Sequence, residues 1–168
     1  HTNFDGFRFQ FLNRKGNLAK KYPTTFQSKL SQFEILNTSS VEIVFKNNSL
    51  KRVAIKFDEN FGLGTNFYMG EEAIFVSDVI KSGLKVGFVP EQILSHSQVT
   101  TGHKTAISKI YFAQSAVFYR IFGKMYLFWI ALKLIFDLKQ SKINFTEVVH
   151  LFKQAQKGKK AYVNATKL

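Results

Sequence analysis

The alternation of apolar and polar residues in the first half of the chain predicts short strands separated by loops. Residues 7–12 alternate large apolar with polar side chains and lead into a polar turn that contains glycine. Residues 39–45 are rich in the β-branched and aromatic side chains that strands favour. Residues 84–89 predict a strand that Pro90 stops, and residues 92–96 predict a second, separate extended piece.

Helical spacing of apolar residues is confined to short stretches of the first half and dominates the second. Residues 71–83 carry apolar side chains at intervals of three and four and close on a glycine, which predicts a helix, and residues 48–52 resemble a short capped helix. From about residue 105 the chain has long apolar stretches without proline, so three further helices are expected at 105–121, 123–139 and 144–157. The basic run 157–160 is interpreted as a solvated, frayed end.

The change in texture near residue 105 predicts two regions, residues 1–104 and residues 105–168. The most apolar stretch, residues 125–136, contains Lys133. It has about half of the roughly 20 residues that a helix needs to cross a bilayer, so it is not expected to span one.

Charge separates the same two regions. Residues 105–168 carry 11 basic and 2 acidic side chains, whereas residues 1–104 carry 13 and 9, within a net charge of +13 for 168 residues. A basic surface attracts the phosphates of a nucleotide, a nucleic acid or an anionic membrane, and charge alone does not choose among them. The chain has no cysteine, which excludes a disulfide scaffold, a thiolate zinc site and a cysteine nucleophile, and agrees with a reducing cytosol.

Two adjacent carboxylates, Glu71 and Glu72, open the predicted helix of residues 71–83. Carboxylates in a first helical turn interact favourably with the helix dipole, so a structural cap is one explanation. The other is general-base catalysis, because mutual repulsion and partial burial raise the pKa of a carboxylate toward working pH. The pattern leaves both explanations open.

Six short motifs follow one another in an order that resembles the C-terminal half of the catalytic domain of family 2 inverting nucleotide-sugar glycosyltransferases. They are Ser-Ser-Val-Glu-Ile-Val-Phe-Lys at 39–46, Phe-Asp-Glu-Asn-Phe-Gly-Leu-Gly at 57–64, Gly-Glu-Glu at 70–72, Lys-Ser-Gly at 81–83, Lys-Val-Gly-Phe-Val-Pro at 85–90 and Ser-His at 95–96. In that family the second acid of the pair is usually aspartate, and here it is Glu72, which is one methylene longer.

The resemblance implies an α/β fold, namely the C-terminal, acceptor-side part of an A-type glycosyltransferase domain, a short mixed sheet with helices, followed by a basic amphipathic helical region. It also implies that the half of the domain that binds the donor precedes these residues, so the isolated chain is expected to be inactive. In the intact enzyme a sugar would pass from a nucleotide-sugar donor to a saccharide or lipid-linked acceptor with inversion, in the assembly of cell-envelope polysaccharides. The expected location is the cytoplasm, peripherally on the inner face of the membrane.

The resemblance also assigns roles to individual residues. Glu72 would deprotonate the acceptor hydroxyl, and Glu71 would orient the acceptor or bind its hydroxyls. His96 would complete the coordination of a divalent metal, Mn²⁺ or Mg²⁺, in the intact enzyme, with none expected in this chain alone. The expected acceptor contacts are Glu42, Lys46, Asn66, Phe67 and Tyr68. Phe67 and Tyr68 can equally serve as core or loop packing.

Two other readings assign no catalysis to the chain. A nucleic-acid-binding module would explain the high basic charge, although the chain has no recognised nucleic-acid motif. A membrane-binding module would place the aromatic and aliphatic side chains of residues 105–168 against lipid and their lysines against headgroups. Alternatively, the same helices pack on the rest of the domain, or on a second copy of the chain as a homodimer.

Overall fold

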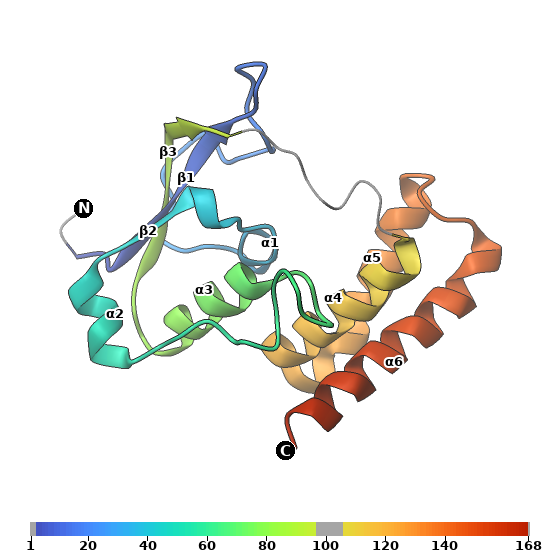
Figure 1. Ribbon diagram of the computed structural model, residues 1–168. Helices are drawn as coiled ribbons and strands as arrows, with labels where there is room; N and C mark the ends of the chain where they lie inside the picture. Colours follow the sequence, from blue (N-terminus) through green and yellow to red (C-terminus); the bar gives the residue numbers. More distant parts are fainter. Residues whose placement is uncertain (1–2, 97–105, 168) are drawn as a thin grey trace. The chain divides into compact units, whose positions relative to one another are not determined.

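The computed structural model describes residues 3–96 and 106–167 and contains both strands and helices (Figure 1). Three strands form one small mixed sheet, and helices make up most of the other regular structure. This confirms the predicted combination of a short mixed sheet with helices, followed by a helical region. Within these described residues, no helix is both long and apolar enough to cross a membrane.

The chain divides into two compact units. The first unit contains residues 1–58 and 71–100, and the second contains residues 59–70 and 101–168. The predicted boundary after residue 104 lies near the end of the first unit and outside the described residues. The prediction did not anticipate that the loop of residues 59–70 belongs with the C-terminal helices.

The sheet of the first unit has the order β2-β1-β3, with β1 (Gly6–Leu12) in the centre. Strand β2 (Ile43–Phe45) runs antiparallel to β1, and β3 (Val86–Ser95) runs parallel to it. The alternation along β1 is the predicted one, but its polar members face the interior, since Arg8 and Gln10 are both buried.

Strand β3 continues through Pro90, so the predicted stop at this proline is wrong. Arg8 pairs with Phe88 and Gln10 pairs with Gln92, which means that two steps along β1 correspond to four along β3. The ladder is therefore irregular around Pro90. Because β3 is an edge strand of the sheet and an irregular ladder needs no N–H at every position, the proline is accommodated there.

The predicted strand of residues 39–45 is shorter than expected. A 3-10 turn, η1 (Ser40–Glu42), replaces its first half, and the strand β2 begins only at Ile43. The backbone N–H of Ser39 donates to Oε1 of Glu42 at 2.7 Å, and this local bond favours a turn over an extended chain. Two short helices flank this segment, α1 (Gln32–Leu36) before it and α2 (Asn47–Val53) after it.

Helix α3 (Glu71–Lys81) supplies most of the helical part of the core of the first unit. The core cluster joins this helix to strand β3 and to the segment around α1, and its members are Leu30, Ile35, Phe75, Val76, Val79, Val86 and Phe88. Burial of these apolar side chains fixes the helix relative to the sheet. The first turn of α3, which carries the acidic pair, is thereby held by a packed helix.

The second unit combines the loop of residues 59–70 with three long helices from the C-terminal part of the chain (Figure 1). They are α4 (Ile107–Phe122), α5 (Tyr126–Lys139) and α6 (Val148–Ala165), with the short 3-10 turns η3 (Gly123–Met125) and η4 (Phe145–Glu147) between them. All three predicted helices are present.

The basic run 157–160 is not a frayed end, because α6 continues through it to Ala165. Gly158 is buried against α4, where a side chain on this glycine would meet the carbonyl oxygen of Phe112 and the hydroxyl of Ser115. The absence of a side chain lets the two helix backbones approach closely. Gly158 therefore serves the packing of α6 on α4.

A buried polar group connects α4 to α5. The hydroxyl of Tyr111 donates to Oδ2 of Asp137 at 2.9 Å, and Nζ of Lys133 donates to the same oxygen at 2.8 Å. Asp137 is 2% exposed, and Lys133 also lies over the Tyr111 ring. The buried carboxylate is thus paired with a cation and a hydroxyl, which is what its burial requires.

Candidate functional site

Glu71 and Glu72 are the first two residues of α3, where its free backbone N–H groups favour negative charge. Both side chains are half-buried. Burial raises the pKa of Glu71, its own backbone N–H opposes that rise, and the neighbouring charge of Glu72 adds to it. The pair therefore combines a helix N-terminus with a carboxyl group that retains its proton to higher pH than an ordinary glutamate.

One oxygen of the Glu71 side chain accepts no hydrogen bond from the described residues. Its Oε2 is buried, and no donor from the described residues reaches it. A buried carboxylate oxygen without a donor is destabilising, and proteins rarely leave one unless a ligand or water supplies the donor. Oε2 of Glu71 can therefore accept a hydrogen bond from a hydroxyl or amide group of a ligand.

Lys20 lies within electrostatic reach of Glu72. Burial lowers the pKa of Lys20, the attraction of Glu42 opposes this shift, and a smaller opposing contribution comes from Glu72. Lys20 thus interacts electrostatically with Glu72, one member of the acidic pair. No sequence pattern indicated this interaction, because Lys20 and Glu72 are far apart in the chain and Lys20 belongs to no regular element.

Glu42 lies at the centre of a buried ion-pair network. Its Oε1 accepts from Nζ of Lys20 at 2.8 Å and from the backbone N–H of Ser39 at 2.7 Å. Its Oε2 accepts from the hydroxyl of Tyr22 at 2.8 Å and lies 3.3 Å from Nη2 of Arg8. A carboxylate has about four acceptor positions, and all of them are occupied here.

This network gives Glu42 a structural place in the fold. The side chain is fully enclosed, so it presents neither surface nor a remaining acceptor position to the sugar that the sequence assigned to it. Burial, followed by the hydrogen bond to Glu42, raises the pKa of Tyr22 above its usual range, so its hydroxyl stays a donor. The ring of Tyr22 stacks on Phe88 of β3 and lies beside the guanidinium of Arg8.

Lys46 is exposed, directly before α2. Its backbone N–H donates to the carbonyl oxygen of Asp5 at 2.8 Å. It borders a shallow hollow of about 110 Å³ whose other walls include Gly6 and Phe45. Lys46 is therefore accessible to a ligand, as the prediction of an acceptor contact requires.

His96 is exposed and follows the end of β3. Its backbone N–H donates to the carbonyl oxygen of Leu12 at 2.8 Å, and its ring packs edge-on near Phe11. In the part of the chain that the structure describes, no three side chains of the His, Cys, Asp or Glu type come together. Among the described residues, His96 is thus not part of a three-ligand cluster, and its role as a metal ligand stays a prediction.

The remaining predicted acceptor contacts, Asn66, Phe67 and Tyr68, belong to the second unit. Asn66 is exposed and Tyr68 is half-buried, whereas Phe67 is 3% exposed. The Phe67 ring stacks on Phe112 of α4 and packs against Phe61. Of the two readings that the sequence left open for Phe67, this burial corresponds to core packing.

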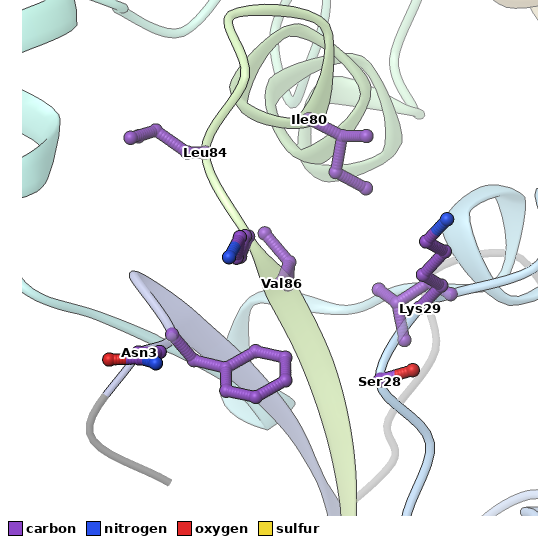
Figure 2. A pocket seen from close by; sticks show the side chains of 9 residues that line it. Asn3, Ser28, Lys29, Ile80, Leu84 and Val86 are labelled. Carbon is purple, nitrogen blue, oxygen red and sulfur yellow. The ribbon is translucent and has the colours of Figure 1, made fainter.

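A pocket of about 610 Å³ lies in the first unit between the end of α3, the start of β3 and the segment 28–30. Figure 2 shows Leu84 and Ile80 at the top, Val86 in the centre and Lys29 on the right. Its walls are mostly apolar, and none of its lining residues is a carboxylate. The pocket and the acidic pair occupy opposite ends of α3, so they are separate features.

Comparisons of the chain with models of protein families, with curated proteins and with solved structures find no match.

Proposed function

We propose that the chain is the acceptor-side part of a family 2 inverting glycosyltransferase with an A-type fold, which transfers a sugar from a nucleotide-sugar donor to a saccharide or lipid-linked acceptor. The order of motifs from residue 39 to residue 96 supports this proposal. The mixed sheet and the acidic pair at the start of α3 are compatible with it.

The proposal depends most on two properties of the Glu71 carboxyl group. Its Oε2 is buried, lacks a donor among the described residues and belongs to a carboxyl group whose pKa is raised. A helix cap needs neither feature, because capping carboxylates accept hydrogen bonds and become more acidic. A hydroxyl group of the acceptor substrate would donate the missing hydrogen bond to Oε2. Glu71 is therefore assigned to bind and orient this hydroxyl group.

Glu72 is assigned as the general base. Its carboxylate takes the proton from the acceptor hydroxyl while the acceptor oxygen forms a bond to the anomeric carbon of the donor. The bond from that carbon to the phosphate oxygen breaks on the opposite side, and the nucleoside diphosphate leaves with the electron pair. One displacement of this kind inverts the configuration at the anomeric carbon.

Lys46, Asn66 and Tyr68 stay predicted acceptor contacts, since each has accessible surface. In the intact enzyme a divalent metal would neutralise the charge of the departing diphosphate. His96 stays the predicted ligand, and because the described residues hold no cluster of three potential ligands, no step is assigned to the metal.

The test is sugar transfer by the full-length gene product from radiolabelled nucleotide-sugars to a panel of saccharide and lipid-linked acceptors. Glu72→Gln keeps the size of the side chain and removes the base, so transfer should fall by roughly 10²–10⁴-fold with little change in KM. Glu71→Gln should act mainly through the KM of the acceptor. Glu91→Gln, at an exposed position of β3, is the matched control and should keep full activity.

Three outcomes are informative. Full activity of Glu72→Gln combined with loss in Glu71→Gln would reverse the two roles. Full activity of both variants would reduce the pair to a helix cap. Absence of transfer from every donor in the wild-type protein would favour a binding module without catalysis.

A further inference from the structure

The exposed side of α5 carries several large apolar side chains. Five large side chains of this helix and of the turn before it are exposed, namely Met125, Leu127, Phe128, Ile135 and Phe136. Phe128, Ile135 and Phe136 are 54%, 63% and 56% exposed. Phe128 and Ile135 are seven residues apart and lie on the side of α5 that faces away from the buried Ile130, while Leu127 and Phe136 lie at the two edges of that side. We refer to these five residues as the α5 ridge.

Lysines stand at both ends of the α5 ridge. Lys124 precedes it, and Lys139 and Lys142 follow it, all three exposed. Nζ of Lys142 lies 5.8 Å from the ring centroid of Phe136, which places this cation beside the ridge itself.

No acidic side chain of α5 offsets these lysines. Its one acid, Asp137, is buried and bonded to Lys133 and Tyr111, so it contributes nothing to the outward face. Glu147, the other acid of residues 105–168, lies in η4, and its Oε2 accepts from the backbone N–H of Asn144 at 2.8 Å. The ridge is therefore apolar in the middle and cationic at its ends.

This charge pattern selects among the surfaces that could cover the ridge. Two copies of α5 that pair through their ridges bring lysines against lysines in either relative direction, because both ends are cationic. An anionic bilayer meets the same pattern without conflict. Apolar side chains enter the boundary between headgroups and acyl chains, while flexible lysines at the ends reach back to the phosphates.

We propose that the α5 ridge binds peripherally to an anionic lipid surface, with α5 lying in the plane of the interface. Lys124, Lys139 and Lys142 contact headgroups, and Phe128, Ile135 and Phe136 enter the apolar boundary. The binding concerns the second unit alone and does not depend on the glycosyltransferase activity proposed above.

Vesicle flotation with the 168-residue chain tests this proposal. The vesicles are either phosphatidylcholine alone or phosphatidylcholine mixed with phosphatidylglycerol, each at low and high salt. The chain should float with the anionic vesicles at low salt and much less at high salt or with neutral vesicles, because salt screens the lysines.

Two pairs of variants separate the apolar from the cationic part. Phe128→Ser should weaken partitioning by about tenfold or more, since a large apolar side chain leaves the lipid, whereas Phe33→Ser, at an exposed position of α1, should not. Lys139→Gln should weaken it by about fivefold, and Lys15→Gln, in an exposed turn of the first unit, should leave it unchanged. All four positions are exposed, so folding should be preserved, and circular dichroism checks this.

Equal flotation with neutral vesicles, or none with anionic ones, would overturn the proposal. So would a dimer, measured by light scattering without lipid, that Phe128→Ser dissociates. Both lipid results are independent of sugar transfer, so the two proposals can fail separately.

Discussion

The ammonium group of Lys20 lies 2.8 Å from Oε1 of Glu42, and the two partners differ in exposure: the side chain of Glu42 is completely buried, whereas that of Lys20 is 14% exposed. Lys20 also donates to the carbonyl oxygen of Asn37 and to the hydroxyl of Ser39, so all three of its protons are used. Glu42 thus holds together residues from β1, from the following loop and from the turn η1. The network anchors the loop that carries Lys20.

Removal of the carboxylate should destabilise the first unit strongly. Glu42→Ala leaves the guanidinium of Arg8 and the ammonium of Lys20 buried without their counter-charge, so the free energy of unfolding should fall by about 3–5 kcal/mol. Lys20→Met should cost less, because Glu42 keeps Arg8, Tyr22 and the Ser39 N–H as donors. Urea unfolding followed by circular dichroism measures both. A larger loss for Lys20→Met than for Glu42→Ala would contradict this account.

The same network shows where prediction from sequence stopped. Local signals gave β1, α2, α3 and the three C-terminal helices, because period and capping residues act over a few positions. The pairing of Glu42 with Arg8, Lys20 and Tyr22 depends on the fold of the whole unit and leaves no mark on the period of any segment. The resemblance to a glycosyltransferase therefore assigned Glu42 to contact the acceptor substrate, although its carboxylate is buried in the fold.

Gly158 shows a second reason why prediction from sequence fails. A glycine within a basic run near the end of a chain predicts fraying, and only the approach of α4 shows that this position must lack a side chain. The burial of the Glu71 carboxyl group likewise depends on tertiary packing. The sequence identified the acidic pair, its helix terminus and the possibility of a raised carboxylate pKa. Which of the two carboxyl groups is shifted, and which of its oxygens lacks a donor among the described residues, depends on burial that spacing does not encode.

Gly158→Ala should destabilise the second unit, although alanine favours helices. The added methyl group meets the backbone oxygen of Phe112, which cannot move without displacing α4. The expected loss is about 1–3 kcal/mol, larger than the roughly 1 kcal/mol of helix propensity that alanine contributes. Lys157→Ala, at the exposed neighbouring position, is the control and should change stability little. A higher melting temperature for Gly158→Ala would show that the two helices are not so closely packed.

Tyr111→Phe should weaken the link between α4 and α5. The change removes the hydroxyl that donates to Asp137 and keeps the ring under Lys133, so a loss of about 1.5–3 kcal/mol is expected for a bond to a charged group. Tyr126→Phe, at a half-buried position at the start of α5, is the matched control and should change stability less. Thermal unfolding measures both. Equal melting temperatures for the two variants would mean that Lys133 alone satisfies Asp137.

The stability of Glu71→Gln distinguishes a ligand-binding carboxylate from a helix cap. Burial raises the pKa of Glu71 in the folded state, so folding is opposed once this carboxyl group ionises. The penalty is absent below the ordinary glutamate pKa of about 4, grows as pH rises from there through the raised pKa, and persists at neutral pH. Glu71→Gln should therefore raise the melting temperature at pH 7 and leave it unchanged in acid.

A simple cap predicts the opposite sign, because loss of a charge that favours the helix N-terminus lowers stability at neutral pH. Glu34→Gln provides that reference, since Oε2 of Glu34 accepts from the backbone N–H of Ser31 at the start of α1. Melting temperatures of the two variants and the parent chain, measured across pH, give the comparison. If Glu71→Gln lowered the melting temperature at pH 7 as Glu34→Gln does, Glu71 would be a cap, and the main support for its role in binding an acceptor hydroxyl would be lost.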